Sequence, residues 1–172
     1  ADAEALDVAS QILSGGKSSR LYRALVDESQ EALYAQGGYW ELQDAGLFFA
    51  SAGVRPGSRI ARVEQLFFDE VARIQDHGVD AGEVAKAKRQ LEVSLVEGLT
   101  TNHALASRIG RETLAFGRVR TLAERLEAIR SVSAADVKRV VQAYLRPEKR
   151  TVVWVIPPTK TSDASSAESR DR

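Results

Sequence analysis

Cysteine is absent from this chain of 172 residues, and histidine occurs only twice, as His77 and His103. The absence of cysteine excludes disulfide frameworks, thiolate nucleophiles and zinc or iron–sulfur sites held by sulfur. Neither histidine stands in an H-x-x-E-H or H-E-x-x-H spacing, the spacings on which catalytic zinc motifs depend. We therefore predict that this chain holds no metal and contributes no catalytic residue.

An excess of charge of either sign is also lacking, because 24 Lys and Arg balance 24 Asp and Glu. Binding to the nucleic-acid backbone depends on a basic excess, so we expect no nucleic-acid partner. The one local excess lies between residues 108 and 130, where six arginines accompany three glutamates. We interpret that stretch as an exposed helical face with ion pairs.

Long hydrophobic runs are missing as well. The longest, Val152 to Ile156, is far shorter than the roughly 20 residues of a membrane helix, so we predict no membrane span. The N-terminus has neither an initiator Met nor a signal-type segment, which predicts a start processed or excised from a longer chain. The sequence therefore contains no signal that distinguishes a periplasmic from a cytoplasmic location.

Helical periodicity dominates what is present. A stripe of apolar residues at steps of three and four predicts a helix between Pro56-Gly57-Ser58 and Gly78. Capping boxes predict two further helix starts, at Asp80 with Glu83 and at Ser133 with Asp136. Apolar stripes predict additional helices within residues 3–14, 105–116 and 119–129.

Two short aromatic and apolar segments, residues 34–42 and 47–54, predict a β-hairpin. Thr151 to Ile156 is rich in β-branched residues and precedes Pro157-Pro158, which predicts a third strand. Three strands are too few to cover this many helices, so we expect further strands from missing sequence or from a partner chain. Residues 159–172 contain no large apolar residue and predict a disordered tail.

The segment Gly15-Gly16-Lys17-Ser18-Ser19 ends like a P-loop. The full pattern fails, because Gln11 stands where the first glycine belongs and a predicted helix precedes the segment instead of a strand. We interpret both glycines as a helix end with positive φ, and Ser18 or Ser19 as the cap of the next helix.

The order of these elements resembles the insulinase/pitrilysin family of zinc peptidases and the subunits of mitochondrial processing peptidase. The resemblance begins with a helix followed by Gly15-Gly16-Lys17-Ser18-Ser19-Arg20-Leu21. It continues through Gly46-Leu47-Phe48, the Glu83 to Lys88 helix, Val132 with Asp136, and Tyr144-Leu145 with Pro147, and it covers about residues 3–158.

The resemblance implies an α+β fold, an antiparallel sheet with helices packed mainly on one face. This processing-peptidase-like roll would have an incomplete sheet in the present fragment. Residues 1–158 would then form a partial C-terminal insulinase-family domain, followed by the disordered tail at 159–172.

The resemblance also implies a function. The family's catalytic domain carries an H-x-x-E-H motif that is absent here. The implied role is a non-catalytic C-terminal domain of a zinc-dependent peptidase, inactive alone, that forms part of a chamber for the peptide substrate. Zinc is then expected in the catalytic domain or partner subunit. The alternative is a binding or assembly module without peptidase activity, which pairs through an exposed strand edge.

Candidate substrate-binding residues follow from the same resemblance. Non-catalytic domains of the family often contribute an arginine and a tyrosine, seven positions apart, to peptide binding. The corresponding positions here hold Val26 and Leu33, so the pair is not reproduced. The neighbouring Arg23 and Tyr34 are the candidates that remain.

Overall fold

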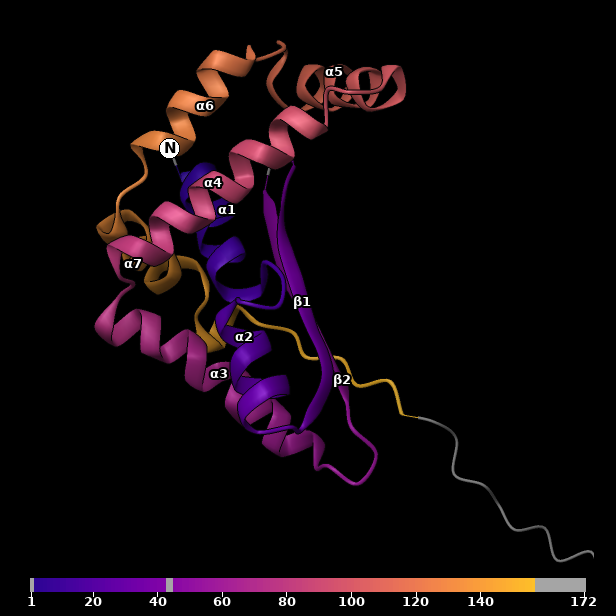
Figure 1. Ribbon diagram of the computed structural model, residues 1–172, viewed down its shortest axis with the longest axis vertical. Coiled ribbons are helices and arrows are strands. Elements are labelled where there is room, and N and C mark those ends of the chain that lie inside the picture. The colour runs from indigo at the N-terminus through magenta and orange to yellow at the C-terminus, as the bar shows by residue number, and fades with distance from the viewer. Residues whose placement is uncertain (1, 43–44, 157–172) are drawn as a thin grey trace, which may run out of the picture.

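A single long β-hairpin lies along one side of the protein, and the helices pack against one of its faces (Figure 1). The computed structural model describes residues 2–42 and 45–156. The helices are α1 (Asp2–Ser14), α2 (Arg20–Tyr22), α3 (Ile60–His77), α4 (Ala81–Glu97), α5 (Asn102–Phe116), α6 (Leu122–Ser131) and α7 (Ala134–Tyr144), with a π-helical segment at Arg23–Glu28 and a 3-10 turn at Pro147–Lys149. The strands are β1 (Ala32–Glu41) and β2 (Gly46–Val54).

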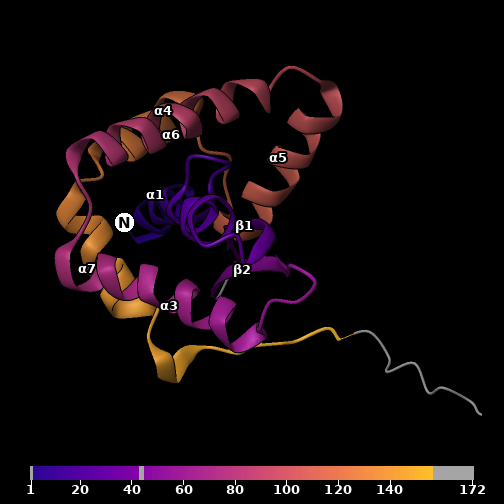
Figure 2. The ribbon, with the colours of Figure 1, turned by 60° about the horizontal axis from the view of Figure 1, so that its bottom comes forward.

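The predicted hairpin is confirmed, and so is the α+β class with helices on one face of an antiparallel sheet. The two strands pair antiparallel from Ala32 opposite Val54 to Glu41 opposite Gly46. Alternate residues of each strand face the helices, and those that pack on the core are Ala35, Tyr39, Phe48, Ala50, Ala52 and Val54. The opposite face of the hairpin carries no helix (Figure 2).

Helix α1 occupies the centre of the helical layer, with α3, α4, α6 and α7 around it (Figure 2). Its apolar residues Ala5, Leu6, Val8, Ala9, Ile12 and Leu13 are all buried. A helix that is apolar on most sides needs neighbours on most sides, which explains why the remaining helices form a ring. Leu13, Leu21 and Leu25 belong to the same buried cluster as Ala32 and Ala35 of β1, so α1 and the turn that follows it pack against the hairpin.

Local signals placed the helix ends well. The capping boxes at Asp80 with Glu83 and at Ser133 with Asp136 are both present, and Thr121 with Glu124 forms a third. Ser19 caps α2 by accepting a hydrogen bond from the backbone N–H of Tyr22, as predicted. These caps satisfy backbone donors that a helix start leaves free.

The glycine pair after α1 behaves differently at its two positions. Gly16 has φ +85°, as predicted, but Gly15 does not adopt positive φ, so that part of the prediction was wrong. Gly15 is instead packed against Gln11, whose carbonyl oxygen would lie 2.4 Å from an added Cβ. Close packing, not backbone conformation, is what requires glycine there.

The third predicted strand is not formed. Thr151 to Ile156 runs without a ladder partner within the described part of the chain, and Val153 and Val155 are 78% and 94% exposed. The β-branched sequence favours extended backbone, but a strand also requires the hydrogen-bonding groups of a neighbouring strand. The predicted tail at 159–172 lies outside the described residues.

No helix in the described ranges is both long and apolar enough to cross a membrane.

Candidate functional site

The outward face of the hairpin is the surface that the helices leave uncovered. Its side chains are Tyr34, Gln36, Gly38 and Trp40 from β1 and Leu47, Phe49, Ser51 and Gly53 from β2. Tyr34, Trp40 and Leu47 are 47%, 56% and 48% exposed. Each of these eight residues is uncharged, in a chain of which 28% is charged. We call this surface the outward hairpin face.

Aromatic rings lie over glycines on this face. The ring of Tyr34 lies against Gly53 across the ladder, where an added Cβ would be 2.4 Å from the tyrosine Cε1. The ring of Phe49 lies over Gly38 with more space, since an added Cβ would be 3.3 Å from the phenylalanine Cζ, and its centroid is 4.6 Å from that of Trp40. The glycines therefore leave room for the rings. We call the ring of Tyr34 and the pair of rings of Phe49 and Trp40 the two aromatic pads of this face.

A β-bulge decides which side chains belong to this face. The register shifts between Ala32 and Tyr34, so Leu33 is an extra residue in β1. Ala32 is buried against the helices, and regular alternation from it would turn Tyr34 inward as well. The bulge reverses the alternation and places Tyr34 outward with Gln36 and Trp40. Sequence patterning contains no reliable sign of such an insertion. Trp40 and Phe49 were missed as candidates because the predicted residues, Arg23 and Tyr34, followed from the family resemblance and not from the alternation of the strands.

An ion-pair cluster anchors the turn end of the hairpin to the helices. Arg120 pairs through Nη1 with Glu4 at 3.0 Å and through Nη2 with Glu41 at 3.1 Å. Its guanidinium also lies 4.1 Å from the ring centroid of Phe116. One side chain from the loop between α5 and α6 thus connects α1, β1 and α5.

Glu112 is the second centre of this cluster, and its side chain is 4% exposed. It accepts from Arg108 Nε at 3.2 Å, from Arg125 Nη1 at 3.1 Å and from the backbone N–H of Arg120 at 2.6 Å. Burial by itself would raise the pKa of Glu112, but these donors outweigh it and the pKa is lowered. The arginine-rich stretch is therefore ion-paired as predicted, although its central pairs are buried and not exposed.

Asp7 on α1 lies close to the same charges. Burial raises its pKa to about 7, aided by the nearby carboxylates of Glu41 and Glu4 and opposed by Arg125 and Arg120. Because the cost of burying the charged form outweighs the attraction of these two arginines, Asp7 binds a proton near neutral pH. The cluster thus contains one carboxyl that ionises only with difficulty.

The structure does not place Arg23 and Tyr34 in one site. Arg23 lies in the π-helical segment and lines a charged groove together with residues from α2, α3 and α4. The groove contains the Arg20–Glu83 pair, with Nη2 to Oε2 at 2.6 Å, and the Arg73–Glu70 pair. Tyr34 lies on the outward hairpin face instead.

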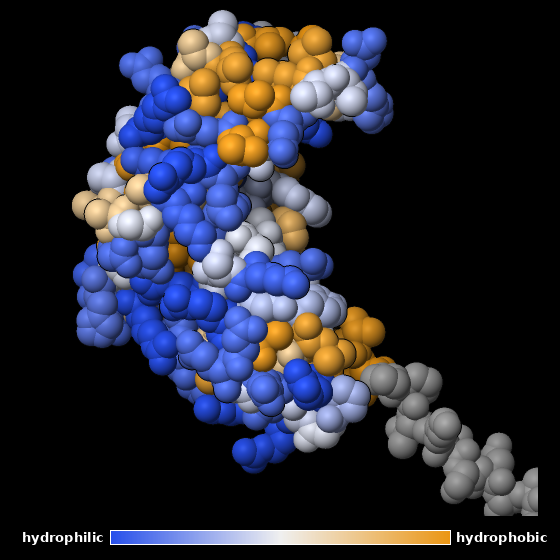
Figure 3. Space-filling model, in the orientation of Figure 1, coloured by the Kyte–Doolittle hydropathy of each residue, from blue (hydrophilic) through white to orange (hydrophobic). Residues whose placement is uncertain are grey.

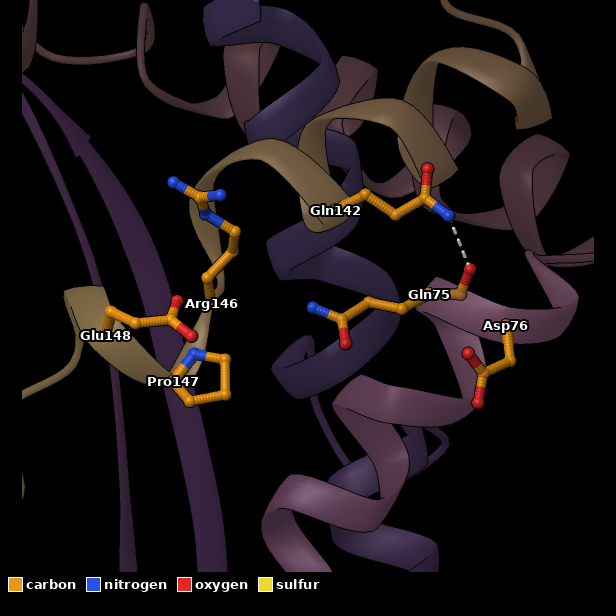
Figure 4. Close-up of a pocket in the computed structure, with 6 residues that line it drawn as sticks. All are labelled: Gln75, Asp76, Gln142, Arg146, Pro147 and Glu148. Carbon is orange, nitrogen blue, oxygen red and sulfur yellow. Dashed lines mark hydrogen bonds between the residues drawn. The ribbon is translucent and has the colours of Figure 1, made fainter.

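A second groove lies between the C-terminal end of α3 and the segment that follows α7 (Figure 4). The side chain of Gln142 donates to the carbonyl of Gln75 at 2.7 Å, and that of Gln75 donates to the carbonyl of Leu145 at 3.0 Å. These amides therefore satisfy helix ends and join α3 to α7. Lys138 completes the same connection by donating to the carbonyl of Asp76 at 2.7 Å.

Across residues 2–42 and 45–156, no three His, Asp or Glu side chains are grouped so that they could hold a metal ion. His77 is the exposed last residue of α3, and His103 lies exposed in the first turn of α5. The donor set that a zinc site needs is thus not assembled by the described residues.

The space-filling view shows how these surfaces are distributed (Figure 3). The helical side is mostly hydrophilic, and the outline is hollowed on the side where the hairpin lies. Hydrophobic side chains gather over α4 and α5, where Val93, Val96, Leu105 and Ile109 are exposed. The hollow lies below α5, and a second hydrophobic patch, over the extended segment that follows α7, lies at its other end (Figures 1 and 3).

Comparison with known proteins gives a consistent result. The chain is 35% identical over 94% of its length to an uncharacterized zinc protease of Streptomyces coelicolor, and spans 34% of that protein. It is 42% identical over 64 residues, 37% of the chain and 14% of the relative, to the beta subunit of mitochondrial-processing peptidase of Lentinula edodes. It thus spans about a third or less of these curated relatives.

A solved structure shares the fold. It is the inactive peptidase domain of a protein named as a zinc protease from Bordetella parapertussis, with a TM-score of 0.80 at 25% identity. The similarity covers 91% of this chain and 85% of that one. Residues 1–91 match the peptidase M16 inactive domain. The match includes α1, the hairpin and α3, and the chain therefore belongs to the peptidase M16 inactive domain family.

Proposed function

We propose that this chain is the non-catalytic part of a zinc peptidase and that its outward hairpin face forms part of the wall of a peptide chamber. Its relatives in the family carry zinc protease names, and they are long enough for a second domain of similar size. The zinc then belongs to that catalytic domain or to a partner subunit, since the described residues here assemble no ligand set. The other partner is the peptide substrate.

The observation that carries the proposal is the one-sided cover of the hairpin. Helices bury one face of β1 and β2, while the other exposes Tyr34, Trp40 and Leu47. Exposed apolar groups that gather on one surface mark interaction sites, because burying them on binding is favourable by roughly 25 cal/mol per Å². A wall of this kind can hold a peptide without taking part in the chemistry.

Individual side chains would contribute in different ways. The rings of Tyr34 and Trp40 offer flat apolar surfaces, and the side chains of Gln36 and Ser51 offer donors and acceptors between them. Arg23 lies in the charged groove beside α3 and is not part of the proposed peptide contact.

The test uses the parent peptidase with Tyr34→Ala and Trp40→Ala. Each substitution removes an exposed ring, so KM for a fluorogenic peptide should rise about tenfold, the equivalent of about 1.4 kcal/mol of binding, with little change in kcat. Leu114→Ala is the matched control, because Leu114 is a 77% exposed apolar residue on α5. An unchanged KM in both ring variants contradicts the chamber role. Stoichiometric zinc or peptidase activity in this chain alone contradicts the non-catalytic role.

A binding or assembly module without peptidase activity is the second candidate. The apolar segment Val152 to Ile156, which has no strand partner among the residues that the structure describes, favours it, because such a segment can add to the sheet of another chain. The two candidates differ in the parent sequence. A parent that lacks H-x-x-E-H, and whose neighbouring subunit also lacks it, supports the assembly module.

A further inference from the structure

The outward hairpin face is unusual in this protein for its lack of charge. The strands contain one ionisable acid, Glu41, whose side chain turns to the helical side and pairs with Arg120. At the base of the hairpin the charged residues Glu31 and Arg55 flank the two strands, and the backbone N–H of Arg55 donates to the carbonyl of Glu31 at 2.9 Å. The eight outward residues of the described strands present only aromatic, aliphatic, amide, hydroxyl and glycine groups.

The two aromatic pads lie at a fixed separation. Tyr34 and Trp40 are six positions apart along β1, which corresponds to about 20 Å at 3.3 Å per residue. Gln36 and Ser51 form the cross-strand pair between the pads, and both are exposed. The face is therefore apolar at both ends and polar but uncharged in the middle.

We infer that this face selects extended peptide segments that carry uncharged apolar or aromatic side chains about six residues apart, and disfavours charged ones at those places. The inference rests on the proposed function, because it names the class of peptide that the wall would take. An extended peptide alongside β1 has nearly the same rise per residue as the strand, so its side chains can reach both pads.

The physical basis is desolvation. An apolar side chain that covers a ring releases water from both surfaces. A lysine or glutamate side chain in the same place loses hydration, and none of the eight residues of this face supplies a counterion. This loss of hydration disfavours positively and negatively charged peptide side chains alike. The charged groove around Arg20 and Glu83 differs in this respect, because it contains groups that can pair with a charge.

The experiment compares two fluorogenic peptides of about twelve residues on the parent peptidase, identical except that one has Phe and the other Lys at two places six residues apart. The zinc-bearing part has preferences of its own, so the informative quantity is how a variant changes the ratio of kcat/KM between the peptides. Gln36→Glu places a carboxylate between the pads. It should shift the ratio toward the Lys peptide by about threefold, the size of one exposed ion pair.

Gln65→Glu makes the same chemical change on an exposed position of α3, on the helical side, and should leave the ratio unchanged. A ratio that Gln36→Glu leaves the same as in the parent overturns the selectivity. If Tyr34→Ala and Trp40→Ala still raise KM in that case, the peptide-wall role stands and only the substrate class is wrong. If they do not, the proposed function itself has failed.

Discussion

Glu112→Gln tests whether the buried ion-pair cluster holds α5 and the hairpin turn in place. The substitution preserves the size and shape of the side chain but removes the charge that Arg108 and Arg125 share. An amide also presents N–H groups toward donors, so at most one of its two terminal atoms can accept. The backbone N–H of Arg120, now bonded to Glu112 at 2.6 Å, then competes with two guanidinium groups for that acceptor.

The magnitude follows from burial. The side chain of Glu112 is 4% exposed, and those of Arg108 and Arg125 are 13% and 17% exposed. Removing one partner of a fully buried pair costs about 3–5 kcal/mol. The two arginines retain some contact with water, so we expect the free energy of unfolding to fall by about 2–3 kcal/mol at pH 7.

The effect should depend on pH with a defined sign. The pKa of Glu112 is lower in the folded protein than its usual value, because the arginine and backbone donors outweigh burial. Its stabilising contribution is complete above the unfolded-state pKa and is lost as the pH falls through the folded-state pKa. The difference between wild type and Glu112→Gln should therefore shrink as the protein is titrated below pH 4.

Urea unfolding followed by far-UV circular dichroism measures the change, and amide hydrogen exchange across residues 102–116 shows whether α5 opens locally. Glu127→Gln is the control, since Glu127 is an exposed carboxylate on the neighbouring helix α6. A Glu112→Gln variant within about 0.5 kcal/mol of that control, with unchanged exchange in α5, refutes the reasoning.

Further outcomes are expected for Asp7, for two glycines and for DNA binding. Because the raised pKa of Asp7 keeps a proton on the folded protein that the unfolded chain has lost, stability should fall as pH rises from about 4 to about 7. Asp7→Asn should therefore stabilise by about 2–4 kcal/mol at pH 8 and by almost nothing at pH 3, measured by urea unfolding. Gly37→Ala should destabilise by about 1–3 kcal/mol, because its Cβ would lie 2.4 Å from the carbonyl oxygen of Phe49. Gly110→Ala, with open space around it on α5, should instead stabilise by up to about 1 kcal/mol. The neutral chain should not be retained on DNA at physiological ionic strength, and salt-dependent retention would contradict this.

Local sequence signals were sufficient for most of the fold. The capping boxes at Asp80 and Ser133 are where the sequence predicts them, the cap at Ser19 is one of the two residues predicted, and the hairpin predicted from residues 34–42 and 47–54 has strands at 32–41 and 46–54. Each depends on residues within a few positions of one another, so the information needed is contained in a short window. The family resemblance rests on the order of these same elements.

Contacts between residues far apart in the chain could not be predicted from such short windows of sequence. The sequence predicts a strand at Thr151 to Ile156, but strand formation depends on a partner that the described part of the chain does not supply. The pairing of Arg120 with Glu4 and Glu41 joins residues far apart in the chain, and periodicity carries no sign of it. Arg23 and Tyr34 are near in sequence, yet they lie in different surroundings.

The sequence by itself determined the class of fold, the helix starts, the family, and the absence of a cysteine or histidine zinc motif from this chain. Those properties follow from residue types and short-range spacing. Only the tertiary structure decided which hairpin residues face away from the helices, because the bulge at Leu33 reverses the alternation. A single inserted residue moves the later side chains of its strand to the other face, which puts Tyr34 and Trp40 on the outward side, and cross-strand pairing with Gly38 places Phe49 beside them.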